Sequence, residues 1–267
     1  MKKITVCGIG VATSVIESVG AFGLQSQAVK REASARLESP ASWAVAAVGQ
    51  AWGMALLDGV NRERIGLLYS STWGSVTATV DYLESLEQAG GRYASPRHFT
   101  RSTYAGPAST LGIEFHIHGP CETLSFDQLP ITSGLDRARR LLGAGRCDAV
   151  VVCWADDSSP IVAGLARLAV EKLHRREFAR YAAEPLGAGA VAVVVSETLD
   201  SPLQWRCEWT QAQPGEQEDV PHPRYPADGA LRLAAAMARA GQGEQGHVLW
   251  TERGGQEARA GLKIFKS

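Results

Sequence analysis

Several features that would assign a function at once are missing from this sequence. It has no run of about 18 or more apolar residues, so no segment is long enough to cross a bilayer as a helix. It has almost no net charge, since 27 basic residues are balanced by 28 acidic ones, so nothing attracts nucleic acid or an anionic membrane. The apolar stretch after Lys2 and Lys3 is short and reads as a strand rather than a signal peptide. We therefore expect a cytoplasmic protein with no nucleic-acid and no membrane partner.

Metal-binding and disulfide patterns are also missing. The five cysteines are an odd number, and no two of them have Cys-x-x-Cys spacing. His116 and His118 would share one face of a strand, but no third ligand follows at a useful spacing. We predict no metal site and no cofactor.

A glycine pair, Gly8 and Gly10, follows the first apolar run and must be compared with a dinucleotide-binding fingerprint. The third glycine of that fingerprint is missing, and no obvious ribose-binding acid follows. The simpler interpretation is a tight turn after the first strand.

What the sequence does contain is an alternation of strands and helices. The strand-like segments are continuous apolar runs rich in valine, which is typical of strands covered on both faces. Strands are predicted at Ile4–Ile9, Ile65–Ser70, Ala149–Trp154 and Ala188–Ser196, with short strand-like pieces in Glu114–Ser125. Helices are predicted at Pro40–Leu57, Val76–Gln88, Thr132–Gly143 and Ile161–Leu173. This order predicts a layered α/β domain over residues 1–200.

The end of the chain has a different composition. Residues 211–226 contain four prolines among charged residues, which indicates a linker. A helix is predicted at Ala227–Ala240, and a hairpin of His247–Thr251 with Arg259–Phe265. We expect residues 201–267 to form a linker and a small helix-and-hairpin extension rather than a second α/β domain.

Two acidic residues, Asp156 and Asp157, directly follow a predicted strand. The carboxyl end of a strand is where α/β proteins often place functional groups, so cation binding is one interpretation. The more common one is an N-terminal cap for the helix at Ile161–Leu173.

The most informative stretch runs from Gly119 to Gln128. A Gly-Pro turn, a strand-like segment, a helix and then the turn Gly145–Asp148 occur in that order. This order resembles the nucleophile region of the β-ketoacyl synthases. In that family the catalytic cysteine begins a buried helix, whose dipole stabilises the thiolate. Counting from Gly119, Gln128 occupies the position of the cysteine.

The resemblance extends to Ile4–Gly10, Arg64–Ser75 and Gly187–Ser196, and so covers most of the chain. It implies a layered thiolase-like α/β fold that corresponds to the N-terminal half of a ketosynthase. Thr123–Ser125 and Gly134-Leu135 are similar to a compact group of chain length factors that accompany aryl polyene and type II polyketide systems. Residues 129–131, Leu-Pro-Ile, depart from the small residues that follow the glutamine in full-length factors.

This family resemblance implies a non-catalytic subunit. A chain length factor pairs with an active ketosynthase, and a chain with Gln128 in place of the cysteine has no thiolate there to hold an acyl group. None of its histidines lies in a His-Gly-Thr-like setting. The implied partners are a catalytic ketosynthase and, transiently, an acyl carrier protein.

The resemblance also implies where the partner and the growing chain would lie. In thiolase-fold dimers, the strand before the nucleophile helix pairs with its counterpart in the other subunit. The implied interface residues are Glu122, Thr123, Leu124, Ser125 and Phe126. The implied pocket-lining residues are Tyr82, Leu83, Leu86 and Phe99. For any single one of these four, ordinary core packing is the simpler interpretation.

Two other hypotheses stay open. A stand-alone thiolase-fold acyl-transfer enzyme would use Cys121 or Cys153 as its nucleophile. Cys121 has no helix directly behind it, and Cys153 lies in an apolar strand, where the pKa of the thiol should rise. The other hypothesis is a structural homodimer without an acyl pocket.

Overall fold

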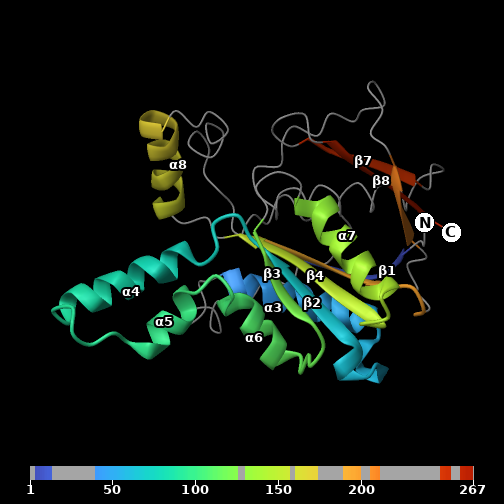
Figure 1. Ribbon diagram of the computed structural model, residues 1–267, viewed down its shortest axis with the longest axis horizontal. Coiled ribbons are helices and arrows are strands. Elements are labelled where there is room, and N and C mark those ends of the chain that lie inside the picture. Colours follow the sequence, from blue (N-terminus) through green and yellow to red (C-terminus); the bar gives the residue numbers. More distant parts are fainter. Residues whose placement is uncertain are drawn as a thin grey trace.

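A computed structural model describes residues 4–13, 40–125, 130–156, 160–173, 189–199, 205–210, 247–253 and 259–266. Its centre is one eight-stranded sheet with the strand order β3-β2-β4-β5-β1-β6-β8-β7 (Figure 1). The strands are β1 (Ile4–Thr13), β2 (Ile65–Ser70), β3 (Cys121–Leu124), β4 (Ala149–Asp156), β5 (Gly189–Ser196), β6 (Trp205–Thr210), β7 (His247–Arg253) and β8 (Arg259–Lys266). The four valine-rich strands predicted from the sequence are confirmed as β1, β2, β4 and β5.

The described helices are α3 (Pro40–Met54), α4 (Val76–Gln88), α5 (Pro96–Ser102), α6 (Gly106–Glu114), α7 (Pro130–Gly143) and α8 (Pro160–Leu173). The four helices predicted within residues 1–200 are confirmed as α3, α4, α7 and α8, with ends shifted by at most a few residues. Two short 3-10 turns, η2 (Leu57–Gly59) and η3 (Arg62–Arg64), lead into β2. The sequence did not predict α5 and α6.

The sheet is parallel in one part and antiparallel in the rest. β3, β2 and β4 run parallel, so their carboxyl ends meet at the same edge of the sheet. Every other neighbouring pair is antiparallel. Functional groups in open parallel sheets commonly gather at the carboxyl ends of the strands.

Apolar side chains cover both faces of the sheet. On one face, α7 contributes Leu135 to a cluster that includes Leu68 of β2. On the other face, α3 and α6 contribute Ala51 and Leu111 to a cluster that includes Leu67 of β2. Every residue of β2, β4 and β5 is buried, which confirms that these strands are covered on both sides.

Gly8 and Gly10 lie where α3 crosses β1. A Cβ atom on Gly10 would lie 1.9 Å from the carbonyl oxygen of Ala47, and one on Gly8 would lie 2.1 Å from that of Ala51. Only glycine permits so close an approach of helix backbone to strand. The prediction of a tight turn at these glycines was wrong, because β1 continues through both of them to Thr13.

The C-terminal strands belong to the same sheet. β7 and β8 form the predicted antiparallel hairpin. β6, which the sequence did not predict, joins that hairpin to β1 through antiparallel pairing on both of its sides. The predicted linker at 211–226 and helix at Ala227–Ala240 lie outside the described residues, and the division into residues 1–200 and 201–267 stays a prediction.

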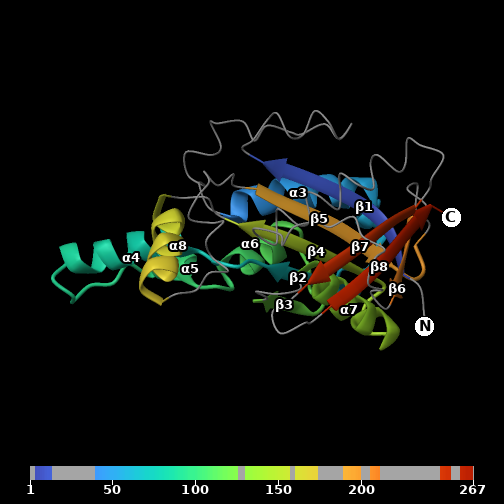
Figure 2. The same ribbon diagram turned by 90° about the horizontal axis from the view of Figure 1, so that it is seen from above.

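One part of the molecule stands away from the sheet. α4 and α5 pack on each other and extend beyond the end of the strands, at the left of Figures 1 and 2. Tyr82 of α4 meets Phe99 of α5 edge to face, with ring centroids 5.7 Å apart. Every residue of α4 is exposed or half-buried. We refer to residues 76–102 as the arm.

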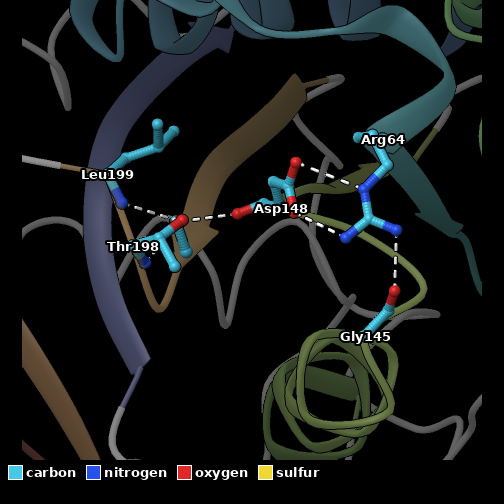
Figure 3. Close-up of polar contacts among 6 residues, drawn as sticks. Arg64, Gly145, Asp148, Thr198 and Leu199 are labelled. Carbon is cyan, nitrogen blue, oxygen red and sulfur yellow. Dashed lines mark hydrogen bonds and ion pairs between the residues drawn. The ribbon is translucent and has the colours of Figure 1, made fainter.

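At the amino ends of β2 and β4, one arginine holds the turn that enters β4. The guanidinium of Arg64 donates to both carboxylate oxygens of Asp148, at 2.6 and 3.2 Å, and to the carbonyl oxygen of Gly145 at 2.7 Å (Figure 3). These hydrogen bonds from Arg64 hold the pKa of Asp148 below its usual value. The hydroxyl of Ser196 in β5 donates to the carbonyl oxygen of Asp148 at 2.6 Å. In this structure the Gly-x-x-Asp turn therefore fixes where α7 ends and β4 begins.

Candidate functional site

The strand that precedes α7 lies at the edge of the sheet. β3 pairs in parallel with β2, from Leu67 opposite Cys121 to Ser70 opposite Leu124. Among the described residues, no strand pairs with its outer edge. An open edge presents unpaired backbone N–H and C=O groups, which form a template for pairing with another chain. The predicted interface residues 122–125 lie on this strand or directly after it, and Phe126 lies outside the described residues.

Two side chains of β3, those of Glu122 and Leu124, make contacts within the chain. The carboxylate of Glu122 accepts hydrogen bonds from Nε and Nη2 of Arg137 on α7, at 2.7 and 2.6 Å. This bidentate pair holds the pKa of Glu122 below its usual value. Leu124 packs against the apolar cluster beneath α7. The backbone of β3 and the exposed residues Cys121 and Ser125 are thus open to a partner, and the interface itself stays a prediction.

Gln128 lies outside the described residues, two positions before α7 begins at Pro130. The first turn of α7 is deeply placed, since Ile131 and Thr132 are buried. A Cβ atom on Gly134 would lie 3.2 Å from the ring of Trp154 in β4, so helix and strand approach closely there. The family resemblance implies that the residue at the cysteine position, here Gln128, lies at the start of a buried helix, and the start of α7 is buried. The role of Gln128 stays a prediction.

A polar network joins the carboxyl ends of β2 and β4. Oδ1 of Asp156, whose residue is 2% exposed, accepts hydrogen bonds from Oγ of Ser71 and from the backbone N–H of Thr72, both at 2.8 Å. Oγ of Ser71 accepts in turn from the N–H of Gly74 at 2.9 Å. A buried carboxylate is stable only when it is hydrogen-bonded in this way. The network therefore fixes the turn that leads from β2 into the arm.

Tyr104 connects this network to the end of β3. Its hydroxyl donates to the carbonyl oxygen of Ser71 and lies 3.3 Å from Oγ of Ser125. Burial raises the pKa of Tyr104, so the hydroxyl stays neutral and remains a donor. Its ring also fills the space beside Gly74, where a Cβ atom would lie 2.5 Å from the ring and where φ is +62°. One side chain thus touches the turn after β2 and the residue that leads toward Gln128.

Asp156 takes part in a contact that the sequence did not predict, because its carboxylate accepts hydrogen bonds from Ser71 and Thr72. The capping of α8 by Asp156 and Asp157 stays a prediction. Asp157 lies outside the described residues. The sequence did carry a signal for this contact, because small polar residues follow β2 as acidic residues follow β4, and parallel strands bring their carboxyl ends together. Tyr104 had no comparable signal, since its role depends on the path of the chain after α5.

The cysteines named in the rival hypothesis have unfavourable surroundings. Cys153 is fully buried in β4, and burial raises its pKa far above the usual value. Partial burial raises the pKa of Cys121, and the charge of Glu122 raises it further. Cys121 also begins β3, so it lies at the amino end of a parallel strand. Neither thiol has the electropositive surroundings that favour a reactive thiolate.

The two histidines considered as metal ligands do not lie on a strand. His116 and His118 follow α6 in a turn, where His116 has φ of +51°. Within the part of the chain that the structure describes, no group of three or more His, Cys, Asp or Glu side chains is placed to hold a metal ion. None of the helices described is long and apolar enough to span a bilayer.

All four predicted pocket residues lie on the arm. Leu83 and Phe99 are each 54% exposed, and Tyr82 and Leu86 are half-buried. They are therefore not part of the two apolar clusters that cover the sheet. Exposed apolar surface that gathers on one element commonly marks a place where another molecule binds. Their assignment to an acyl pocket stays a prediction.

No protein-family model and no curated protein matches this sequence. Its structure, however, is similar to solved ones. The ishigamide ketosynthase/chain length factor matches with a TM-score of 0.69 and 14% identity over 99% of both chains. The ketosynthase ApeO in complex with its chain length factor ApeC, from Xenorhabdus doucetiae, matches with a TM-score of 0.59 and 14% identity over 98% of this chain and 99% of that one. FabH, the 3-oxoacyl-(acyl carrier protein) synthase III of Xanthomonas oryzae pv. oryzae, matches with a TM-score of 0.55 and 15% identity over 98% of both chains.

These similarities confirm the predicted α/β, thiolase-like ketosynthase fold. They extend over nearly the whole chain, including the C-terminal strands that the sequence resemblance did not cover. At this level of identity they establish the fold, and they include both a condensing enzyme and complexes that contain a chain length factor.

Proposed function

We propose that this chain is a non-catalytic chain-length-factor subunit that forms a heterodimer with a ketosynthase. One observation carries the proposal: in a chain with the ketosynthase fold, Gln128 stands two positions before the buried helix α7, where the resemblance places the catalytic cysteine. A glutamine side chain cannot form a thioester, so the chain cannot hold an acyl group at that position. The chemistry would then belong to the partner.

The edge strand β3 offers the partner a way to bind. Its outer backbone groups have no strand partner among the described residues. Antiparallel pairing with the equivalent strand of a ketosynthase would satisfy those groups and join two sheets into one. The Arg137–Glu122 pair would hold the strand in position against α7 while it does so.

The arm offers apolar side chains to the space between the two subunits. Tyr82, Leu83, Leu86 and Phe99 would close the far end of the pocket that receives the acyl chain growing on the partner. Their bulk would set product length by steric exclusion, because overfilling a packed pocket is costly. The products would be polyketides or polyenes of the aryl polyene type. An acyl carrier protein that binds transiently would carry the chains that are elongated.

A stand-alone condensing enzyme is the second candidate, because FabH shares the fold. It would need Cys121 or Cys153 as a nucleophile, and the pKa of both thiols is raised by burial. A homodimer without an acyl pocket is the third candidate, since an open edge strand can also pair with its own copy.

Acyl loading separates the first candidate from the second. The purified chain is incubated with acyl- and malonyl-loaded acyl carrier protein, and its intact mass is measured. We expect no covalent adduct and no condensation product, and we expect Gln128→Ala to remain folded with the same result. An acyl adduct that disappears in Cys121→Ser or Cys153→Ser would contradict the proposed function.

A further inference from the structure

The arm separates its charges between its two helices. α4 has three acidic side chains and no basic one: Asp81, Glu84 and Glu87. The following segment, residues 89–101, has three arginines and no acidic residue: Arg92, Arg97 and Arg101. We refer to residues 89–101 as the basic segment. The first acidic residue after it is Glu114, at the end of α6.

The arginines of the basic segment are exposed, and no carboxylate among the described residues pairs with them. The ion pairs that the structure describes lie on the sheet, on α7 and beside η3, and none involves the arm. Arg97 and Arg101 are also four residues apart on α5, where like charges repel and destabilise a helix. An arrangement that is unfavourable in the isolated chain becomes favourable once carboxylates of another molecule face it.

Exposed aromatic rings lie among these arginines. Tyr93 is 80% exposed and Phe99 is 54% exposed. Arginine and aromatic residues together are typical of protein–protein interfaces. A long polyanion fits poorly, because the three carboxylates of the adjoining α4 would repel it and the chain as a whole carries a net charge of −1. The charge pattern therefore favours a folded protein with a local acidic surface.

The basic segment ends three residues before Tyr104, which contacts the end of the open strand. Tyr104, two residues beyond the end of α5, lies 3.3 Å from Oγ of Ser125, the residue after β3. A subunit that pairs along β3 would therefore lie near Tyr104 and the C-terminal end of α5. This contact ties the basic segment to the same partner rather than to an unrelated protein.

We propose that the basic segment docks on a carboxylate-bearing surface of the ketosynthase, beside the strand that pairs with β3. This inference rests on the proposed function and adds the chemistry by which the chain would select its partner. Complementary charges raise the association rate and suppress wrong partners. A ketosynthase with a basic or neutral surface at this place would be rejected, because the arginines would lose solvent without gaining a carboxylate.

Charge reversal tests this inference in the intact complex. The dissociation constant of chain and ketosynthase is measured for the wild type and for Arg97→Glu/Arg101→Glu, at low salt and at about 1 M salt. We expect the double variant to bind at least about tenfold more weakly at low salt. The difference should nearly vanish at about 1 M salt, where the Debye length is about 3 Å. Arg97→Lys/Arg101→Lys, which keeps the charge, should bind far better than the reversed variant.

Arg206→Glu is the control, since Arg206 is exposed on β6, which four strands separate from β3 in the sheet. It should leave the dissociation constant unchanged, and circular dichroism should show that every variant is folded. Equal affinity of wild type and Arg97→Glu/Arg101→Glu would overturn the inference and leave the proposed function standing. Failure of the wild type to bind the ketosynthase would overturn both. Loss of self-association alone in the reversed variant would assign the surface to a second copy of this chain.

Discussion

The sheet and the arm use apolar side chains in opposite ways. In β2, β4 and β5 every residue is buried, and the helices on both faces close over them. On α4 every residue is exposed or half-buried, and Leu83 is 54% exposed. A fully buried leucine contributes about 1.5–3 kcal/mol to stability, whereas one left in water contributes little. Burial in the sheet therefore contributes most of the stability of the chain. The apolar side chains of the arm contribute little to it and remain available for contact with another molecule.

The largest effect should follow from a side chain at Gly10. Gly10→Val would push a side chain into the carbonyl oxygen of Ala47 and force α3 away from β1. We expect a loss of at least about 3 kcal/mol in the free energy of unfolding, or failure to fold, because overpacking a rigid core is destabilising. Urea unfolding followed by circular dichroism measures it.

Gly53→Ala, in the helix α3 that packs against Gly10, is the control. Nothing lies within 4 Å of a Cβ atom at Gly53. Replacing a helical glycine with alanine there should raise stability by up to about 1 kcal/mol. A Gly10→Val protein as stable as the wild type would show that the close contact between α3 and β1 does not exist.

A smaller effect should follow at the boundary between sheet and arm. Asp156→Ala would leave the hydroxyl of Ser71 and the N–H of Thr72 without their acceptor in a buried place. We expect a loss of about 1–3 kcal/mol in the free energy of unfolding. Asp156→Asn keeps an acceptor oxygen and should lose less. Equal stability of Asp156→Ala and the wild type would mean that the network does not fix the start of the arm.

The smallest effect on stability, with a large effect on function, should come from the arm. Leu83→Trp should change the free energy of unfolding by no more than about 0.5 kcal/mol, because Leu83 is mainly exposed. If the arm closes the pocket, the larger ring should shorten the product made by the assembled complex. Mass spectrometry of the products, beside thermal unfolding of the variant, measures both effects.

Ile113→Trp serves as the control for that experiment. Ile113 is 77% exposed on α6, outside the arm. Its substitution should alter neither stability nor product length. If the products of Leu83→Trp were unchanged, the arm would not line the pocket. If the variant lost much stability, the arm would contribute to the folded core as the sheet does.

The sequence predicted the sheet well, because its central strands carry their information locally. Runs such as Val150–Cys153 are apolar without interruption, and only a strand or helix buried on all sides accommodates them. β6 was missed although apolar and polar residues alternate from Trp205 to Trp209, a strand signal that was readable. Its place in the sheet was not readable, because it depends on β1, far away in the sequence. α5 was missed although Ser95 caps it and Pro96 begins it, a start signal that was readable.

The candidate site was only partly predictable, because its contacts join distant segments. Ser71 and Asp156 are 85 residues apart and meet only because β2 and β4 pair in parallel. Glu122 is predicted at a subunit interface, but the sequence did not predict that its carboxylate is bound to Arg137 of the same chain. Sequence patterns show which residues are apolar or charged. They do not show which side chains of an edge strand contact the same chain and which remain free to contact a partner.

The central claim is that this chain is the non-catalytic subunit of a heterodimer in which a ketosynthase catalyses the condensation. Native mass spectrometry of the chain co-expressed with its candidate ketosynthase partner tests this claim most directly. The account predicts one dominant species with a single copy of each subunit, in which the 28.5 kDa chain is bound to its partner. A spectrum in which this chain occurs only as a monomer or only with its own copy would contradict it.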